Sequence, residues 1–249
     1  MIRIRMIALA ALAATIGFGI AARAADPAPP ALDRPQIERI VRDYLREHPE
    51  VILEAVDAFK KKQEEAELTD IKKAMAARRA EIVSDPSSPV GGNVKGDVTL
   101  VEFFDYQCGV CKSVHGMVAD MVKSDGRIRR VYKDWPILGP ESMFAARAAL
   151  ASRKQDKYVA FHDALMEAKA PLSDQTVFAT AKTVGIDIAR LKRDMNDPEI
   201  AAILQRNFAL ADALHINGTP SFVIGNVLVR GARDLDSMRD LVARARKPG

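Results

Sequence analysis

The sequence predicts an α/β domain preceded by an N-terminal α-helical stalk, and three observations lead to this fold class. Residues 98–104 form an apolar run rich in β-branched side chains, typical of a buried strand, and a helical period follows directly. Strand patterns return at 128–133 and 221–229, and helical patterns over 140–215 separate them. Residues 33–83 carry helical periods of their own, which predict the stalk.

The first 24 residues have the three parts of a secretory signal peptide. Arg3 and Arg5 precede an apolar run over 7–22, and Ala22-Arg23-Ala24 supplies small residues at the two positions that signal peptidase reads. We therefore expect cleavage near Ala24 and export of the mature chain. An uncleaved anchor is the alternative, although the run is shorter than the roughly 20 apolar residues that span a bilayer.

The mature chain is close to neutral. The whole sequence has 37 Lys and Arg against 33 Asp and Glu, a net charge of +4. Three of the arginines belong to the leader, so its removal leaves 34 basic against 33 acidic side chains and a net charge of +1. This balance provides no electrostatic footprint for nucleic acid, and we expect no nucleic-acid partner.

Both cysteines lie in one motif, Cys108-Gly-Val-Cys111, where the first strand pattern gives way to a helical one. Cys108 falls at the exposed N-terminus of this helix, where free N–H groups and the helix dipole favour a thiolate, so we expect it to be the nucleophile. Cys111 lies one turn further, faces the core, and is placed to resolve a mixed disulfide. A disulfide across so short a loop stabilises little, so the predicted role of the pair is chemical.

A lone Cys-x-x-Cys motif is also half of a zinc site. Zinc needs four ligands, and the four histidines of this chain are scattered singly, without a paired histidine motif. Only His115 lies near, four residues after Cys111 on the same helix face, and it is a candidate for tuning the thiols. His162 falls among aromatic residues on an apolar face and is expected to be a packed core histidine. We expect no metal site and no cofactor.

Two charged residues are candidates for assisting the thiols. Glu102 stands in the middle of the apolar strand, where an acid is normally excluded unless its proton affinity is used, so we expect it to accept the proton of Cys111. The alternative is that Glu102 points outward from a half-exposed strand. Lys133 ends the strand pattern at 128–133 and is expected either beside Glu102, where it would tune that acid, or facing solvent.

Thr219-Pro220 precedes the strand pattern that begins at Ser221. A proline directly before a strand that must pair needs a reason. A cis Thr219-Pro220 bond supplies one, because it turns the backbone of Thr219 outward, where an extended substrate peptide can pair with it. An ordinary trans proline at a strand start is the alternative.

The N-terminal stalk is predicted to be two amphipathic helices. Asp33 and Gln36 form a capping box for the first helix, Pro49 ends it, and a second helix is expected from about 50 to 83. Short amphipathic helices without a core of their own commonly bury their apolar faces against a second copy of the chain, so we expect oligomerisation through 33–59. Packing back on the catalytic domain is the alternative. Residues 84–97, rich in Pro, Gly, Ser and Asn, are expected to be a linker.

The order of these features resembles the thioredoxin superfamily, and the helical insertion makes the chain similar to its DsbA branch. The resemblance covers Val98 to the C-terminus and implies a thioredoxin fold with a DsbA-like insertion at about 140–215. It places Glu102, the dithiol and Thr219-Pro220 where the family keeps its buried acid, its redox centre and its cis-proline loop.

Two details distinguish the chain from the monomeric oxidase type of that family. The dipeptide between the cysteines is Gly109-Val110, without the Pro-His of that oxidase, and the segment from Cys108 to His115 resembles the disulfide isomerase DsbC. The segment from Tyr44 to Ile52 is similar to the N-terminal segment of the ScsC proteins, which are DsbA-like and, in some members, trimeric isomerases. The resemblance implies a homo-oligomer, with a trimer favoured.

The resemblance implies a periplasmic thiol–disulfide oxidoreductase, foremost an isomerase or reductase that acts on exported proteins with cysteines. An isomerase must keep its dithiol reduced in an oxidising compartment, so a membrane thiol reductant is expected as electron donor. Two alternatives stay open. One is a DsbA-type dithiol oxidase. The other is a Cu(I)-binding protein of copper tolerance that holds the ion between its two thiolates, as the resemblance to the copper-linked ScsC group allows.

Overall fold

The computed structural model describes residues 33–247, so the predicted signal peptide and its cleavage site near Ala24 lie outside the described residues. The chain divides into two compact units, Met1–Ala58 and Phe59–Gly249. Among the described residues, no helix combines the length and the apolar character that crossing a membrane requires.

The first unit contains helix α1, Arg34–Glu47, and the beginning of helix α2, Glu50–Ala77. The capping box predicted at Asp33 is confirmed: its carboxylate accepts a hydrogen bond from the Gln36 N–H (2.8 Å), and the Gln36 side chain accepts one from the Asp33 N–H (3.0 Å). Within the described part of this unit, α1 has no buried residue, although its sequence is strongly amphipathic.

The expected single helix from 50 to 83 is wrong in one respect, because the chain forms two helices there. Helix α2 ends at Ala77, and α3 covers Arg79–Val83. Arg78 at the break pairs with Glu81 (2.7 Å) and donates to the Ala209 carbonyl (2.8 Å). The break thus accompanies tertiary contacts of Arg78. The sequence has no glycine or proline near this position, so no helix-breaking residue predicts the break.

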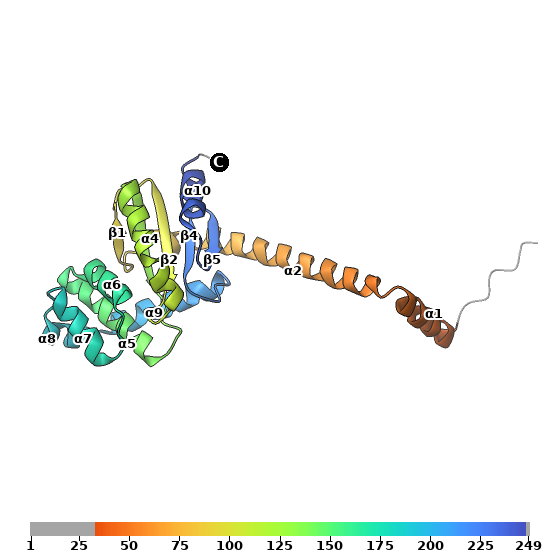
Figure 1. Cartoon of the computed structure of the whole chain (residues 1–249), viewed down its shortest axis with the longest axis horizontal. Coiled ribbons are helices and arrows are strands. Elements are labelled where there is room, and N and C mark those ends of the chain that lie inside the picture. Colours follow the sequence, from red (N-terminus) through yellow and green to blue (C-terminus); the bar gives the residue numbers. More distant parts are fainter. Residues whose placement is uncertain (1–32, 248–249) are drawn as a thin grey trace, which may run out of the picture. The chain divides into compact units, whose positions relative to one another are not determined.

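The second unit is built on a five-stranded sheet with the order β1-β3-β2-β4-β5 (Figure 1). Strands β2 and β3 are parallel, and the other three neighbouring pairs are antiparallel. The strands are β1 Val90–Gly92, β2 Val98–Phe104, β3 Ile128–Asp134, β4 Ser221–Ile224 and β5 Val227–Arg230. This mixed sheet confirms the predicted α/β class.

Residues 84–97 were expected to be a linker, but they also contribute the edge strand β1. Val90 lies opposite Val131 in the antiparallel register with β3. A Cβ added at Gly91 would come within 2.7 Å of the Tyr132 hydroxyl, so the glycine permits the close approach of the two strands. The Gly-Gly pair that reads as a linker in sequence is therefore part of the sheet.

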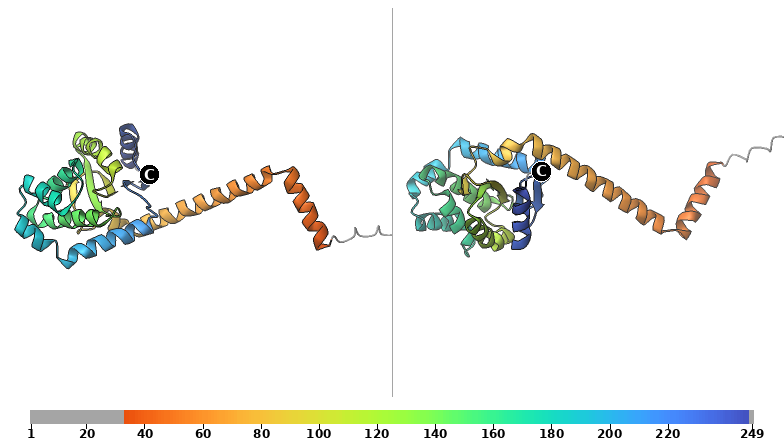
Figure 2. Two further views of the ribbon diagram at one scale, coloured as in Figure 1. Left: turned by 60° about the horizontal axis from the view of Figure 1, so that its bottom comes forward. Right: turned by 90° about the horizontal axis from the view of Figure 1, so that it is seen from above.

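Helices cover both faces of the sheet. Helix α4, Gly109–Asp125, and helix α10, Leu235–Ala245, lie on one face (Figure 1). The end of α2, α3 and helix α9, Pro198–Ala213, lie on the other, where α9 runs beside the end of α2 in both views of Figure 2. Ile71 and Met75 of α2 are buried there, so this part of the predicted stalk belongs to the catalytic core.

The expected helical insertion is present between β3 and β4 and confirms the DsbA-like form of the thioredoxin fold. It consists of α5 Pro140–Ala151, a 3₁₀ turn Ser152–Gln155, α6 Tyr158–Glu167, α7 Asp174–Thr183, α8 Ile188–Asp194 and α9. Its apolar side chains share one hydrophobic cluster with Phe104 at the end of β2 and with Cys111 of α4. The insertion therefore packs directly behind the dithiol.

Candidate active site

The turn from β2 to α4 carries the dithiol, and Asp105 fixes the backbone of this turn. Its buried carboxylate accepts hydrogen bonds from the Gln107 N–H (2.7 Å) and the Ser142 hydroxyl (2.6 Å). It also accepts from the N–H groups of Ile137 and Leu138 (2.8 and 2.9 Å). Asp105 was not among the residues predicted for the site, although an acid directly after a buried strand, three residues before the first cysteine, was the available signal.

Cys108 is the N-cap residue of α4. Its sulfur accepts a hydrogen bond from the Cys111 N–H (3.1 Å), and its thiol donates to the Thr219 carbonyl (3.4 Å). The expectation that Cys108 is exposed is wrong, since only 6% of the residue is accessible. The loop that carries Thr219 lies against the sulfur and covers it, while Gly109 and Val110 beside it are exposed.

The two thiols have opposite pKa shifts. The hydrogen bond from the Cys111 side chain lowers the pKa of Cys108 to about 6 against the opposing effect of burial, and Thr219 and the N–H groups of Cys111 and Val110 add to the lowering. The same bond to Cys108, together with burial, raises the pKa of Cys111. At neutral pH the pair therefore consists of a Cys108 thiolate and a Cys111 thiol, as the assignment of nucleophile and resolving thiol requires.

The Thr219-Pro220 bond is cis, which confirms the conformation expected from the sequence. It leads directly into β4, the antiparallel neighbour of β2, so Thr219 lies near the end of β2 that leads to the dithiol. Thr219 itself is half-buried.

Glu102 is buried in β2, so the alternative of an outward-pointing acid is wrong. Its carboxylate accepts two hydrogen bonds from the Arg130 guanidinium of β3, at 2.6 Å from Nη2 and 3.2 Å from Nε. Arg130 also lies over the Tyr132 ring, 4.7 Å from its centroid. Arg130 was not predicted from the sequence, because only the strand register reveals which basic residue meets Glu102.

Lys133 does not lie beside Glu102, and the expectation that it tunes this acid is wrong. Lys133 is paired in register with Phe103, whose side chain points to the opposite face of the sheet from that of Glu102. Its buried ammonium group forms an ion pair with Asp85 (3.0 Å) instead. The other expectation, a lysine facing solvent, is also wrong.

His115 and His162 meet in the core between α4 and α6. Their ring centroids are 5.3 Å apart, and the His115 Nε2 lies 3.4 Å from the Asp163 Oδ1. Burial, followed by the charges of Arg130 and Lys112, lowers the pKa of His115 to about 4, and burial holds the pKa of His162 well below its usual range. Both imidazoles are therefore neutral at pH 7. His162 is packed among aromatic rings, as expected.

A stabilised thiolate, a second thiol one helical turn away and a cis-proline loop against the sulfur are the parts that thiol–disulfide exchange needs. The chemistry moves two electrons between dithiols and needs no further group. The fold and the site together define the class of thioredoxin-fold proteins that carry a dithiol arranged for thiol–disulfide exchange.

Comparisons with known proteins agree with this class. A family model described as thioredoxin matches residues 84–244, and the chain therefore belongs to this family. A second model, described as the copper resistance protein ScsC N-terminal domain, matches residues 33–66. The resemblance to DsbA-like and ScsC-like proteins is thereby confirmed.

Several solved structures are similar to this chain. A thioredoxin-like oxidoreductase from Silicibacter pomeroyi is 47% identical, with a TM-score of 0.67 over 69% of this chain and 99% of that one. The thiol-disulfide exchange protein α-DsbA2 from Wolbachia pipientis is 32% identical, with a TM-score of 0.66 over 70% and 95%. The catalytic domain of Proteus mirabilis ScsC is 28% identical, with a TM-score of 0.65 over 70% and 98%.

The curated relatives include proteins of different overall length. The chain spans 26% of the length of two Na⁺/H⁺ antiporters NhaA from Salinispora, at 24% and 25% identity over 64% of this chain. Disulfide bond formation protein D of Bacillus subtilis is 25% identical over 64% of this chain and 77% of its own length. The similarity to the antiporters thus covers about a quarter of those proteins.

Proposed function

We propose that this chain is a disulfide isomerase or reductase that acts on exported proteins. The observation that carries the proposal is the pair of unlike thiols at the cis-proline loop, together with an N-terminal helix whose apolar face is exposed. The first feature supports attack on a substrate disulfide, and the second supports an assembly of several active sites.

In the proposed reaction, the Cys108 thiolate attacks one sulfur of a substrate disulfide. The substrate S–S bond breaks, a mixed disulfide forms, and the other substrate sulfur leaves as a thiolate. In isomerisation, another substrate thiolate attacks the mixed disulfide and regenerates the Cys108 thiolate, with no net electron transfer. In reduction, Cys111 attacks Cys108, which forms the intramolecular disulfide and passes two electrons to the substrate.

The reductive step requires that Cys111 lose its proton, and its raised pKa makes an acceptor necessary. Glu102 is the proposed acceptor, acting through a water molecule. Because Arg130 holds its carboxylate in a buried ion pair, Glu102 is fixed in position on the face of the sheet that α4 covers. His115, one turn after Cys111, would add a neutral, buried neighbour to the same thiol.

Exposed apolar side chains beside the dithiol support a protein substrate. Val110, between the cysteines, is 49% accessible, and Ile137 and Leu138 of the adjoining loop are 38% and 49% accessible. Asp105 connects that loop to the turn before Cys108. An unfolded chain offers the apolar segments that such a surface binds, and its backbone would pair with that of Thr219.

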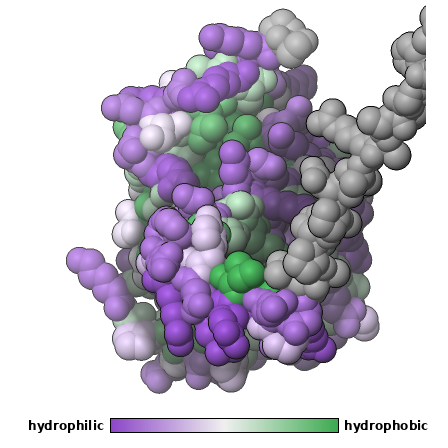
Figure 3. Space-filling view, turned by 90° about the vertical axis from the view of Figure 1, so that its right-hand side faces the viewer, coloured by the Kyte–Doolittle hydropathy of each residue, from purple (hydrophilic) through white to green (hydrophobic). Residues whose placement is uncertain are grey.

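The exposed apolar face of α1 supports a homo-oligomer, with a trimer favoured. On the side of the molecule drawn in Figure 3, hydrophobic residues (green) reach the surface between hydrophilic ones (purple). In α1 and the first part of α2, the large apolar residues that are 42–67% exposed are Ile37, Ile40, Val41, Tyr44, Ile52, Leu53, Val56 and Phe59. Joined dithiols would let one active site hold a misfolded chain while another tests its disulfides.

Two further parts of the proposal are the cellular location of the mature chain and the source of electrons for its dithiol. We place the mature chain in the periplasm, after cleavage near Ala24, on the strength of the signal-peptide pattern and of a structural relative described as a periplasmic thioredoxin-like protein from Salmonella. An isomerase in this oxidising compartment needs a steady source of electrons. A membrane thiol reductant would supply them.

A dithiol oxidase of the DsbA type is the second candidate, because curated relatives include a thiol:disulfide interchange protein DsbA from Bordetella parapertussis, 26% identical over 61% of this chain. An oxidase needs a strongly stabilised thiolate and a high reduction potential. The redox potential of the Cys108–Cys111 pair therefore distinguishes the two candidates.

The test is the refolding of a model protein with scrambled disulfides, with the mass of the enzyme measured by light scattering. Ile40→Asp/Tyr44→Asp charges the exposed apolar face of α1, and Arg39→Gln changes a residue on its polar face as a control. We expect the wild type and the control to be oligomers that recover substrate activity, and the double variant to be a monomer that still reduces small disulfides. A wild-type monomer that only oxidises reduced substrate would overturn the isomerase proposal.

A further inference from the structure

Helices α4 and α6 bring three potential metal ligands together in the core of the second unit. His115 lies on α4, and His162 and Asp163 lie on α6. One ligand atom of each residue lies within 4.8 Å of those of the other two. His115 is 3% accessible and His162 is fully buried, while the Asp163 side chain is 40% accessible. The cluster is thus buried on one side and open on the other.

The buried atoms of this cluster lack the hydrogen bonds that such atoms normally have. The Nδ1 of His162 is bonded to the Tyr106 hydroxyl (3.2 Å), and its Nε2 has no partner among the described residues. The Asp163 Oδ1 likewise has no hydrogen-bond partner there, whereas at His115 the unpartnered atom is Nδ1 and not the Nε2 that faces Asp163. A buried polar atom without a partner is unfavourable, so an ion that binds the His162 Nε2 and the Asp163 Oδ1 would be bound favourably.

We propose that His115, His162 and Asp163 bind a divalent transition-metal ion of the Zn²⁺ type. Imidazole nitrogen and carboxylate oxygen are the ligands that Zn²⁺ takes at about 2.0–2.2 Å, and three protein ligands leave a fourth position for water. Two ligands of a tetrahedral ion at such distances lie about 3.3–3.6 Å apart. The His115 Nε2 and the Asp163 Oδ1 are 3.4 Å apart, so this edge of the tetrahedron is already formed.

The surroundings of the cluster suit a bound cation. Metal-binding histidines commonly donate their second N–H to an oxygen, and the Tyr106 hydroxyl provides that oxygen for the His162 Nδ1. Two positive charges lie nearby, Arg130 and Lys112. The Glu102 carboxylate, 2.6 Å from Arg130, neutralises the first, and the Lys112 ammonium donates to the carbonyls of Leu165 and Ala168. The Asp163 carboxylate supplies the negative charge of the cluster itself.

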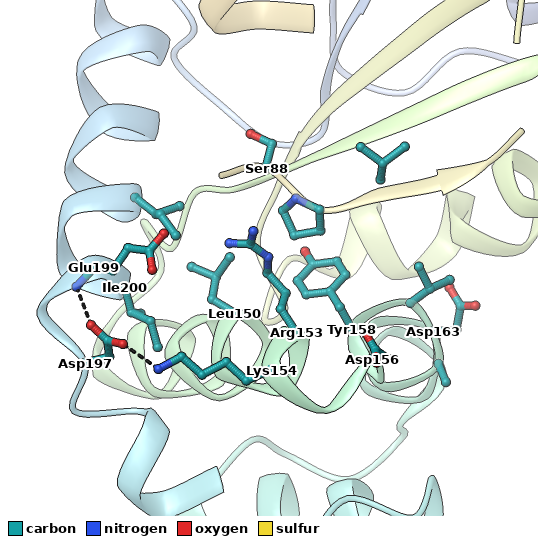
Figure 4. A pocket seen from close by; sticks show the side chains of 15 residues that line it. Ser88, Leu150, Arg153, Lys154, Asp156, Tyr158, Asp163, Asp197, Glu199 and Ile200 are labelled. Carbon is teal, nitrogen blue, oxygen red and sulfur yellow. Dashed lines mark hydrogen bonds and ion pairs between the residues drawn. The ribbon is translucent and has the colours of Figure 1, made fainter. Parts of the chain in front are cut away.

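An ion can reach the cluster from the surface. Asp163 lines a cavity of about 920 Å³ together with residues of β1, α6 and α9, and neither cysteine is among the lining residues. In Figure 4, Asp163 lies at one end of the row of lining side chains, on the far side of Tyr158 from Arg153. The ion would therefore enter beside Asp163 and reach the two histidines behind it, since of the three ligands only Asp163 lines this cavity.

The experiment uses the full mature chain with Cys108→Ser/Cys111→Ser, which removes binding through the thiolates. Titration with Zn²⁺ by calorimetry and with Co²⁺ by visible absorption should show one ion per chain, with the intense d–d bands of a tetrahedral site. Zn²⁺ should also raise the melting temperature, since an ion that binds only the folded state stabilises it.

Ligand variants test the assignment in the same background. Asp163→Asn and His115→Gln should each weaken Zn²⁺ binding by at least about 100-fold, the upper end of what loss of a supporting partner costs a metal site. His48→Gln and His215→Asn each remove one imidazole elsewhere in the chain and should leave the affinity for Zn²⁺ unchanged.

If a histidine variant fails to fold, Asp163→Asn still tests the proposal. Asp163 is partly exposed, and the asparagine amide has the same shape as the carboxylate that it replaces. The absence of one-to-one binding would overturn the proposal. Binding that Asp163→Asn leaves unchanged, or that His48→Gln abolishes, would overturn it equally.

Discussion

Two buried ion pairs flank the central strands on opposite faces of the sheet, and they differ in the chemistry of their basic partners. On the α4 face, Glu102 meets the Arg130 guanidinium at 2.6 Å, with side chains that are 1% and 3% accessible. On the α3 face, Lys133 meets Asp85 at 3.0 Å, with side chains that are 1% and 14% accessible. The first pair lies on the face that carries the dithiol, and the second lies away from it.

This difference determines which ion pair can tolerate the loss of its acidic side chain. Arginine stays protonated in any folded protein, so Arg130 would remain a buried charge without Glu102. A buried lysine can instead give up its proton, and burial already lowers the pKa of Lys133 against the opposing effect of Asp85. Asp85 is also held by hydrogen bonds from Ser87 (2.9 and 2.6 Å) and Ser88 (3.0 Å).

The largest effect is expected from Glu102→Gln. It leaves the Arg130 guanidinium buried and unpaired, which should lower the free energy of unfolding by about 3–5 kcal/mol in urea denaturation. The double variant Glu102→Leu/Arg130→Met removes both charges and should recover most of this loss. If Glu102 also accepts the proton of Cys111, both variants should release reduced substrate more slowly than the wild type. A double variant with normal reduction would leave Glu102 a purely structural role.

A smaller effect is expected from Asp85→Asn. The Lys133 ammonium loses its ion pair, but neutralisation of the lysine limits the loss of stability to about 1–3 kcal/mol at pH 7. Thiol–disulfide exchange should be unchanged, because Lys133 points away from the dithiol. Reduction of a small disulfide by this variant is the measurement, and a rate as low as that of Glu102→Gln would break the distinction between the two pairs.

The pH dependence of these variants should sharpen the comparison. In Asp85→Asn, the pKa of Lys133 in the folded state lies below its unfolded value, so the unfolded chain binds more protons between the two values and stability rises with pH. The deficit of Asp85→Asn relative to the wild type should therefore shrink from pH 7 to about pH 10. The deficit of Glu102→Gln should persist, because Arg130 does not titrate in this range. Equal slopes for both variants would contradict the argument.

The sequence was sufficient for features that depend on neighbouring residues. The strand with its embedded acid, the dithiol at a helix start, the cis Thr219-Pro220 bond and the Asp33 capping box are local patterns, and the structure bears them out. The burial of Glu102 also followed from the apolar residues on either side of it.

Features that depend on register or on packing between distant segments were not predictable. Glu102 meets Arg130 and not Lys133, because the parallel register places Lys133 opposite Phe103 and strand alternation sends its side chain to the other face. His115 and His162, single histidines in the sequence, meet only because α6 of the insertion packs on α4. Strand β1 was not predicted, because glycine in sequence is typical of a loop, whereas Gly91 permits the close approach of β1 to Tyr132 of β3.

The smallest effect concerns the Cys108 thiolate, whose pKa neither ion pair controls. The Cys111 side chain is the largest cause of the lowering to about 6, followed, against the opposing effect of burial, by Thr219 and nearby N–H groups. The rate of alkylation of reduced protein by iodoacetamide should therefore be half-maximal near pH 6 in the wild type and in Asp85→Asn alike. Cys111→Ala should move the midpoint to higher pH, because the thiolate loses its strongest hydrogen bond. A midpoint that Cys111→Ala leaves unchanged would show that the helix terminus alone stabilises the thiolate. A midpoint that Asp85→Asn raises would show that the ion pair on the α3 face influences the pKa of Cys108.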